Sequence, residues 1–321
     1  MADKKPQKSG LLPADALTGV RLGISVSESL DLARLGLTES HFRIAIGEIA
    51  RCVLASNGQL TYGGHLDPEG YTAFLMGELE RYHRGDRPFH ICLAWPVHRR
   101  YSLDYLREQR ESLKSKGDIT YLDVEGIPTD DPAAGRTEEP VPKPDPATQK
   151  QGLTSLRRYM AKNTEGRIFI GGKRTGFTGD WPGLVEEAIF ALETDQPIYL
   201  AGGYGGVTLD MVRALGIDDC NWFPGFSDEV AQDPRCSDGL ERLARIREER
   251  GGKLPDNGLD DSENRQLAAT HRPSEIAALI SLGLGKLFAG KQMEANVRFF
   301  RTLAKSRRPQ GEIKGSFGTR R

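Results

Sequence analysis

The sequence lacks any long apolar run. None of its hydrophobic stretches approaches the roughly 20 residues that a membrane-spanning helix needs, and the opening MADKKPQKSG has no apolar core like that of a signal peptide. Hydrophobic residues make up 38% of the 321-residue chain and charged residues 28%, a balance typical of a globular protein. We therefore expect a cytoplasmic protein with no membrane partner.

Patterns for metal binding are missing as well. The six histidines are scattered with no H-E-x-x-H, and the four cysteines show no paired metal-ligand spacing. Inert, reduced thiols are the better interpretation in a cytosolic protein. A net charge of −1 argues against a general nucleic-acid binder. We expect no metal site and no bound cofactor, and nucleic acid is not an expected partner.

Two common phosphate-binding signatures are also absent, namely G-x-x-x-x-G-K-[ST] and a clean G-x-G-x-x-G after a strand. Glycine loops are nonetheless prominent in residues 167–206. This segment carries an apolar run, a glycine loop, a helix opened by Pro182, a second apolar run and a second glycine loop, an order that predicts a βαβ unit. The glycines that stop the two apolar runs are Gly171 and Gly172, followed by Gly202 and Gly203.

Such loops have two uses. Glycines allow close approach of a ligand, and a helix start offers free N–H groups to an anion such as phosphate. The alternative is that they make tight turns, which would be the better interpretation for a single glycine pair. Two loops in successive units favour phosphate or nucleotide binding, to which the side chains of Lys173 and Arg174 could contribute. Ser25, near the end of the first predicted strand, could donate to a phosphate or simply fill a loop.

A second alternation of strands and helices precedes this unit, so the chain as a whole predicts an α/β fold. Strands are expected at 20–25, 60–62, 89–95 and 119–124, and helices at 39–55, 71–82, 102–115 and 153–161. Further helices are expected at 207–215, 240–250 and 273–288, with irregular or polar segments at 218–232 and 251–261.

The expected domain organisation is one domain over residues 19–304, between a flexible N-terminus (1–18) and a basic, solvated tail (305–321). Its C-terminal part, 238–304, is expected to be helical. Residues 128–148 contain six prolines and many charges, which predicts a mobile insertion, with a lid as the alternative.

A basic cluster, His98–Arg99–Arg100, follows a predicted buried strand. Ligands of open α/β sheets bind at the carboxyl ends of strands, so the cluster could face a cleft. An ordinary solvated loop is the favoured interpretation, because charge runs usually are solvated.

Four short motifs together resemble the SLOG superfamily. They are LTYGG at 60–64, LRRYM at 156–160, IFIGG at 168–172 and PGLVEE at 182–187, and they occur in this order. The superfamily includes LOG cytokinin-activating hydrolases, DprA-type DNA-binding proteins, and nucleotide-sensing domains of TRP-melastatin channels and of bacterial antiphage defence proteins. The resemblance covers roughly residues 20–215 and implies a Rossmann-like, open, mainly parallel sheet with helices on both faces.

LOG enzymes hydrolyse the N-glycosidic bond of nucleoside monophosphates, and the resemblance transfers their site by position. Glu187 matches the final glutamate of the family loop and Arg157 its catalytic arginine, so these are the candidate catalytic residues. The candidate nucleotide-binding residues are Ser25, Gly63, Gly64, Gly171, Gly172, Lys173, Arg174, Gly183, Glu186, Gly202 and Gly203. On a helical wheel Glu187 borders the apolar stripe, whereas Glu186 falls on the opposite face, where solvation is expected.

The chain departs from the LOG pattern in its loop. Residues 173–183 stand where LOG enzymes have a much shorter segment, and Leu184 replaces the family threonine. Two readings follow: an N-glycosidase acting on a nucleotide or NAD-like substrate through Glu187 and Arg157, or a non-catalytic sensor of a nucleotide-derived signal of the ADP-ribose type. A DprA-like DNA-binding protein is a third reading, disfavoured by the net charge. Family members are often dimers, which makes a homodimer compatible with the resemblance.

Overall fold

The computed structural model describes residues 14–82, 87–114, 116–133, 136, 143–223 and 233–289. Its seven strands form one sheet in the order β5–β4–β3–β2–β1–β6–β7, and every neighbouring pair is parallel except β4 with β5. The predicted Rossmann-like, open and mainly parallel sheet is therefore confirmed. The strands are β1 (Arg21–Ser27), β2 (Gln59–Gly63), β3 (Phe89–Leu93), β4 (Gly117–Leu122), β5 (Pro128–Thr129), β6 (Gly166–Gly171) and β7 (Ile198–Ala201).

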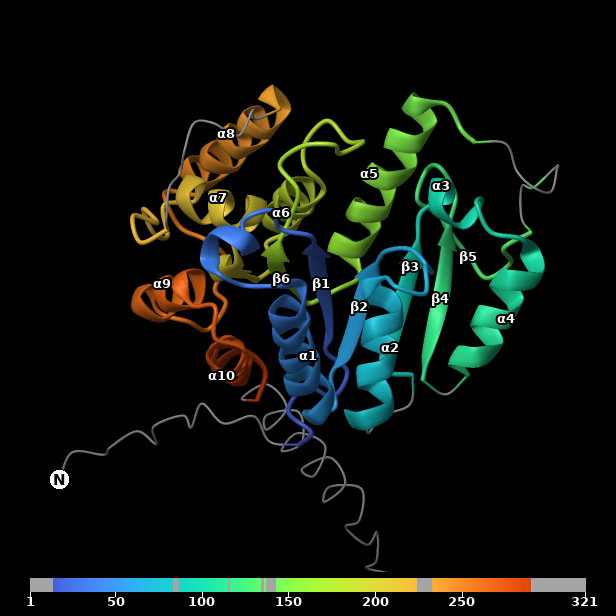
Figure 1. Ribbon diagram of the computed structural model, residues 1–321, viewed down its shortest axis with the longest axis horizontal. Coiled ribbons are helices and arrows are strands. Elements are labelled where there is room, and N and C mark those ends of the chain that lie inside the picture. The colour runs from blue at the N-terminus through green and yellow to red at the C-terminus, as the bar shows by residue number, and fades with distance from the viewer. Residues whose placement is uncertain are drawn as a thin grey trace, which may run out of the picture.

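Helices cover both faces of this sheet (Figure 1). They are α1 (Glu39–Ala55), α2 (Tyr71–Tyr82), α3 (Trp95–His98), α4 (Leu103–Leu113), α5 (Pro146–Lys162), α6 (Gly183–Glu193), α7 (Gly206–Ala214), α8 (Pro234–Glu249), α9 (Asp261–Ala269) and α10 (Pro273–Leu284). One core joins α1, α2, α4 and α10 to one face of the sheet, and a second joins α6, α7 and α8 to the other.

The predicted βαβ unit over 167–206 is present as β6, α6 and β7, with β6 and β7 parallel. The position of this unit in the sheet indicates where a crevice at the strand ends is expected. From β1 the chain moves through β2 and β3 toward one edge, whereas from β6 it moves to β7 at the other edge. The strand order thus reverses between β1 and β6, and in open α/β sheets ligands bind outside the carboxyl ends of the strands at such a point.

Two helices begin well before the predicted positions, and both begin at an Asp-Pro pair. Pro146 opens α5 behind Asp145, whose carboxylate accepts from the N–H of Ala147 at 2.9 Å. Pro234 opens α8 behind Asp233 in the same way. Aspartate is a good N-cap, and proline at the first helical position loses no hydrogen bond.

The proline-rich segment 128–148 is consequently not one mobile loop. Residues 128–129 form the edge strand β5, antiparallel to β4, and residues 146–148 belong to α5. Residues 134–135 and 137–142 lie outside the described part of the chain. Helix α9 lies within the part expected to be helical (238–304), but it was not predicted as a separate helix. It begins with a capping box formed by Asp260 and Glu263, and its residues are mostly polar.

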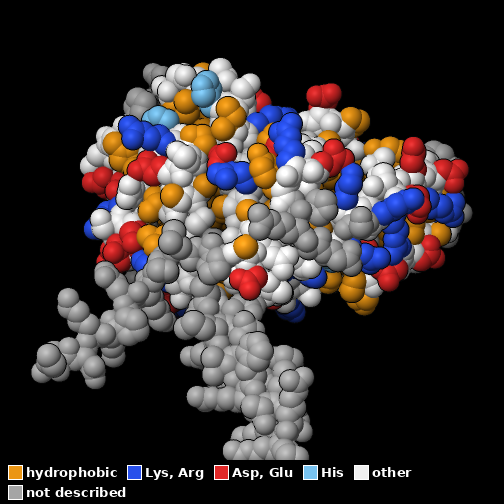
Figure 2. All heavy atoms as spheres, turned by 90° about the horizontal axis from the view of Figure 1, so that it is seen from below, with side chains coloured by type: hydrophobic (Ala, Val, Ile, Leu, Met, Phe, Trp, Pro, Cys, Tyr) orange, Lys and Arg blue, Asp and Glu red, His pale blue; other side chains and the backbone are white. Residues whose placement is uncertain are grey.

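The end of the molecule opposite this crevice is seen in Figure 2, where basic and acidic side chains are interspersed on the visible face. Two ion pairs lie near the amino ends of β3 and β4: Arg87 contacts Asp118 at 3.0 Å and Lys116 contacts Glu80 at 2.6 Å. Among the described helices none is both long and apolar enough to cross a membrane. The predicted tail (305–321), residues 1–13 of the predicted flexible N-terminus and residues 290–304 of the helical part lie outside the described residues.

Candidate functional site

A cavity of about 340 Å³ opens at the carboxyl ends of β1 and β2, next to the point where the strand order reverses. Ser27 comes from the end of β1, Tyr62 from β2, and Lys173 from the loop that follows β6. Three neighbouring strand ends therefore contribute to one hollow. The complete lining is Val26, Ser27, Glu28, Tyr62, Gly63, Gly64, His65, Tyr71, Val97, Arg100, Leu153, Leu156 and Lys173.

The charged residues of this cavity are mainly basic. The ammonium of Lys173 lies 3.1 Å from the carboxylate of Glu28, and these two side chains are 50% and 63% exposed. Arg100 adds a second cation to the lining, whereas Glu28 is the one carboxylate that the described residues contribute to it. An exposed ion pair contributes little to stability, so Lys173 is available to an anionic ligand that displaces Glu28.

A second cavity of about 460 Å³ adjoins the first and shares Val97, Arg100 and Leu153 with it. Arg99 and Lys143 also line it. The predicted solvated loop at His98–Arg99–Arg100 is wrong: His98 ends α3, and both His98 and Arg99 are buried. Burial lowers the pKa of His98 to about 4, and its Nε2 lies 3.0 Å from the Leu122 carbonyl oxygen. The alternative, a basic cluster at the cleft, fits Arg99 and Arg100.

The glycines of the first predicted phosphate loop serve close backbone packing. Gly171 and Gly172 have φ of 71° and 105°, a region that favours glycine. A Cβ at Gly171 would lie 2.4 Å from the Ser27 carbonyl oxygen, and the Gly172 carbonyl accepts from the N–H of Val207 at 3.0 Å. The loop is thereby held against β1 and the start of α7.

The second predicted loop is packed even more tightly. A Cβ at Gly203 would lie 1.9 Å from the carbonyl oxygen of Thr270, and one at Gly202 would lie 2.6 Å from that of Ala268. The connection between α9 and α10 therefore occupies the space over these glycines. Here close packing of two backbones explains the glycines.

The glycines of the LTYGG motif do border the cavity, and each also makes room for a neighbouring side chain. A Cβ at Gly63 would lie 2.5 Å from the sulfur of Met160 on α5. At Gly64 it would lie 2.2 Å from the ring of Tyr62. The motif thus brings a tyrosine ring against the backbone at the cavity wall.

Arg174, predicted to bind phosphate, is engaged by two buried carboxylates. Its guanidinium lies 2.6 Å from Asp31 and 2.6 Å from Asp210, and it also donates to the Gly206 carbonyl at 3.0 Å. Burial lowers the pKa of Arg174, but the hydrogen bonds and charges of Asp210 and Asp31 outweigh it and raise the pKa. This cluster ties the loop after β6 to the loop after β1 and to α7.

The candidate arginine Arg157 forms an ion pair with Glu186, and both side chains are almost entirely buried. Glu186 also accepts from the Thr154 hydroxyl at 2.6 Å. The expected solvation of Glu186 is therefore wrong, because α6 is covered by α5 and α8 as well as by the sheet. Gly183 gives the guanidinium room, since a Cβ there would lie 2.9 Å from it.

The candidate carboxylate Glu187 pairs with an arginine that the sequence analysis did not single out. Arg167 of β6 is fully buried and lies 2.7 Å from Glu187, and the Ser25 hydroxyl also donates to this carboxylate. The strand register places Gly23 beside Arg167, and a Cβ at Gly23 would lie 3.2 Å from the guanidinium. An arginine in a buried strand opposite a glycine is the signal that could have revealed this pair.

Glu187 and Arg157 thus belong to two separate ion pairs. Neither residue lines the cavity, although each is close to it in the chain or in space. Arg157 follows Leu156 of the cavity wall, and Glu187 is bonded to Ser25, two residues before Ser27 on β1. The Glu187 side chain is 14% exposed. The predicted catalytic side chains therefore lie behind the residues that line the cavity.

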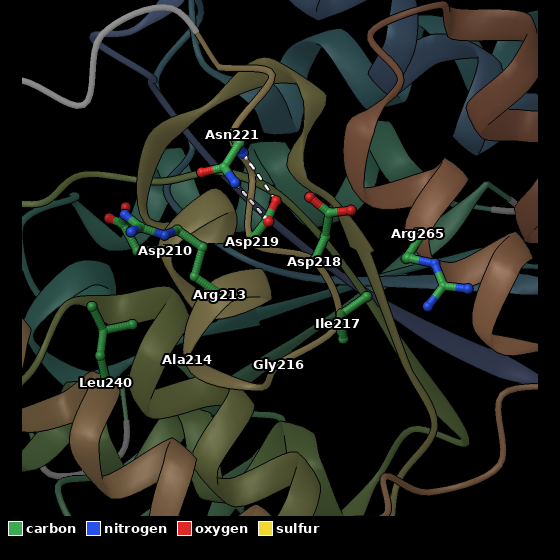
Figure 3. A pocket seen from close by; sticks show the side chains of 10 residues that line it. All are labelled: Asp210, Arg213, Ala214, Gly216, Ile217, Asp218, Asp219, Asn221, Leu240 and Arg265. Atoms are coloured by element: carbon green, nitrogen blue, oxygen red, sulfur yellow. Dashed lines mark hydrogen bonds between the residues drawn. The ribbon is translucent and has the colours of Figure 1, made fainter.

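A larger cavity of about 870 Å³ lies at the C-terminal end of α7 (Figure 3). Asp218, Asp219 and Asn221 are grouped on one side of it, and Asn221 donates to Asp219 at 2.6 Å. None of the predicted site residues lines this cavity, although Asp210, an ion-pair partner of Arg174, does. Within the described residues no group of His, Cys, Asp or Glu could hold a metal ion.

Comparison with known proteins identifies the family. A search of curated proteins found no match. The family model described as SLOG cluster2 matches residues 16–267, which is well over half of the chain and includes both the cavity and the buried ion pairs. This protein therefore belongs to the SLOG cluster2 family.

Proposed function

We propose that this protein binds a phosphorylated nucleotide derivative in the 340 Å³ cavity at the carboxyl ends of β1 and β2. The SLOG family is nucleotide-related. The observation that carries the proposal is the lining of the cavity, which holds two cations, Lys173 and Arg100, and among the described residues one carboxylate, Glu28, at the reversal point of the sheet. A phosphate would replace Glu28 as the partner of Lys173.

The apolar part of the same lining suits the rest of such a ligand. Val97, Leu153 and Leu156 form one wall, and the Tyr71 ring contributes to the lining as well. Ligand sites typically combine an apolar lining with a few placed polar groups. A base or ribose against this wall and a phosphate at Lys173 would use both parts.

Hydrolysis of an N-glycosidic bond is the second candidate function, and the Glu187 side chain supports it. Its carboxylate is held by Arg167 and Ser25, and the side chain is 14% exposed. A fixed carboxylate of this kind stabilises positive charge that develops at the anomeric carbon or orients a water molecule. Against this candidate stands the pairing of Arg157 with Glu186, which engages the other predicted catalytic group.

The two candidates are separated by one experiment with AMP, ATP, NAD and ADP-ribose. Binding is followed by thermal shift and calorimetry, and hydrolysis by chromatography of released base. We expect a ligand-induced stabilisation that Lys173→Met weakens, because the phosphate loses its cation. Lys162→Met, which removes an exposed lysine at the end of α5, is the matched control and should bind like the wild type.

The outcome for catalysis depends on released base. Release that Glu187→Gln abolishes and that Glu193→Gln retains would support the hydrolase, since Glu193 lies on the same helix in an exposed pair with Arg242. Stabilisation without release supports the sensor. A protein that neither shifts nor releases base with any of the four compounds contradicts both.

A further inference from the structure

Tyr62 differs from the other tyrosine that lines the cavity. Tyr62 is 6% exposed and lines the cavity. Its hydroxyl forms no hydrogen bond with any described residue. Tyr71 lines the same cavity, but its hydroxyl donates to the carboxylate of Glu39 at 3.0 Å. A buried phenol normally finds a partner, because leaving its hydroxyl without one costs free energy.

The local sequence holds the Tyr62 ring in this position. Gly64 follows two residues later, and a Cβ there would lie 2.2 Å from one ring carbon of Tyr62 and 2.7 Å from another. A glycine at this position is therefore required for the ring to lie where it does. Gly64, the second glycine of LTYGG, accordingly makes room for the Tyr62 ring at the cavity wall.

A cation, Lys173, lines the same cavity as the unpaired Tyr62 hydroxyl. Both residues line the same 340 Å³ cavity, one from β2 and the other from the loop after β6. Burial, and to a smaller extent the charge of Glu187, raise the pKa of the Tyr62 phenol, so the group keeps its proton at neutral pH. A neutral O–H that lines the same cavity as a cation is suited to an anionic oxygen of a ligand, because hydrogen bonds to charged groups are the stronger ones.

We infer that Tyr62 is a ligand-contacting residue whose hydroxyl donates to a phosphate oxygen of the bound nucleotide, with Gly64 as the residue that positions its ring. This assignment rests on the proposed function and adds to it a specific contact. It predicts that the cavity distinguishes a nucleotide from its nucleoside partly through Tyr62.

The test measures affinity by calorimetry for AMP, ADP-ribose and adenosine, with Tyr62→Phe and with Tyr199→Phe as the matched control. Tyr62→Phe removes only the hydroxyl and should weaken the phosphorylated ligands about fivefold to tenfold. Its effect on adenosine should stay within about twofold, since adenosine has no phosphate. Tyr199→Phe removes a buried hydroxyl that donates to the Asn257 carbonyl away from the cavity lining, and it should leave all three affinities within about twofold.

Gly64→Ala provides a second variant that keeps the hydroxyl but displaces the ring. It should weaken AMP and ADP-ribose as Tyr62→Phe does, and a thermal unfolding curve shows whether each variant is folded. Equal binding by wild type and Tyr62→Phe overturns the contact, as does an equal loss for adenosine; in both cases the proposed function stands. A wild-type protein that binds neither phosphorylated ligand overturns the contact and the proposed function together.

Discussion

Two adjacent residues at the start of the loop after β6, Lys173 and Arg174, use their charges in opposite ways. Arg174 is buried between two carboxylates, whereas its neighbour Lys173 is half exposed and shares one loosely held carboxylate at the cavity. The first arrangement satisfies its guanidinium within the protein, and the second leaves an ammonium that a ligand can reach. In this molecule the extent of pairing, more than the charge itself, separates residues that support the fold from residues that can bind an anion.

The largest test of this comparison is Arg174→Met. The substitution strands Asp31 and Asp210 in the interior without a counter-charge, so we expect it to lower the free energy of unfolding by about 3–5 kcal/mol. Lys173→Met, at the exposed pair, should change it by less than about 1 kcal/mol. Urea denaturation measures both. Similar losses for the two variants would remove the distinction.

The pairing of the candidate catalytic residues can be tested by two double-mutant cycles on stability. The variants are Arg157→Met combined with Glu186→Gln, and Arg157→Met combined with Glu187→Gln. We expect a coupling of about 2 kcal/mol between Arg157 and Glu186, which form a buried pair, and less than about 0.5 kcal/mol between Arg157 and Glu187. The reverse order would restore Glu187 as the partner of Arg157.

The buried side chain of His98 makes the stability of the protein depend on pH. His98 has a pKa of about 4 in the folded protein because burial disfavours its charged form, against about 6.5 in the unfolded chain. Between these values the unfolded chain binds a proton that the native protein does not, so stability falls as the pH drops from about 6.5 toward 4.

The matching variant is His98→Gln, whose amide can still donate to the Leu122 carbonyl. Between pH 7 and pH 5 it should lose about 2 kcal/mol less stability than the wild type. Urea denaturation at the two pH values gives this difference. His90, whose pKa burial also lowers to about 4, is present in both proteins and cancels. An identical pH dependence would mean that His98 does not titrate differently on unfolding.

The smallest expected effect concerns the exposed side of the comparison. Glu28→Gln removes the carboxylate that competes for Lys173, so we expect the affinity for AMP to rise about threefold at low salt and less at high salt. Glu111→Gln, in an exposed pair with Lys114 on α4, is the control and should leave the affinity unchanged. A loss of affinity in Glu28→Gln would assign Glu28 a direct contact with the ligand.

The sequence predicted most of the sheet and its order along the chain, because short apolar runs bounded by glycines are a strong local signal. Helices 39–55 and 71–82 have the predicted bounds. The starts of α5 and α8 were predicted too late, because the local signal there was a helix N-cap within a polar segment. Asp145 and Asp233 each stand before a proline inside a polar segment, and composition alone made both segments look irregular.

The site was harder to predict, since tertiary contacts decide which polar groups are free. A helical wheel placed Glu186 on the solvated side of α6, but that rule assumes one covered face. Here α5 and α8 cover the sides that the sheet does not. The glycines of the two loops pack against the backbone of segments distant in sequence, as Gly203 does against the Thr270 carbonyl. A local sequence pattern does not encode such long-range contacts. Whether Glu187 and Arg157 act in catalysis stays a prediction.

The family match ends at residue 267, inside the folded unit. Helix α10, beyond that boundary, packs along α1, and Gly283 meets Gly258 at backbone contact. A chain trimmed to the boundary would uncover the apolar side of α1 and lose the carbonyl groups that abut Gly202 and Gly203. Such a fragment should aggregate, so the shortest autonomous version of this protein has to retain the α10 segment.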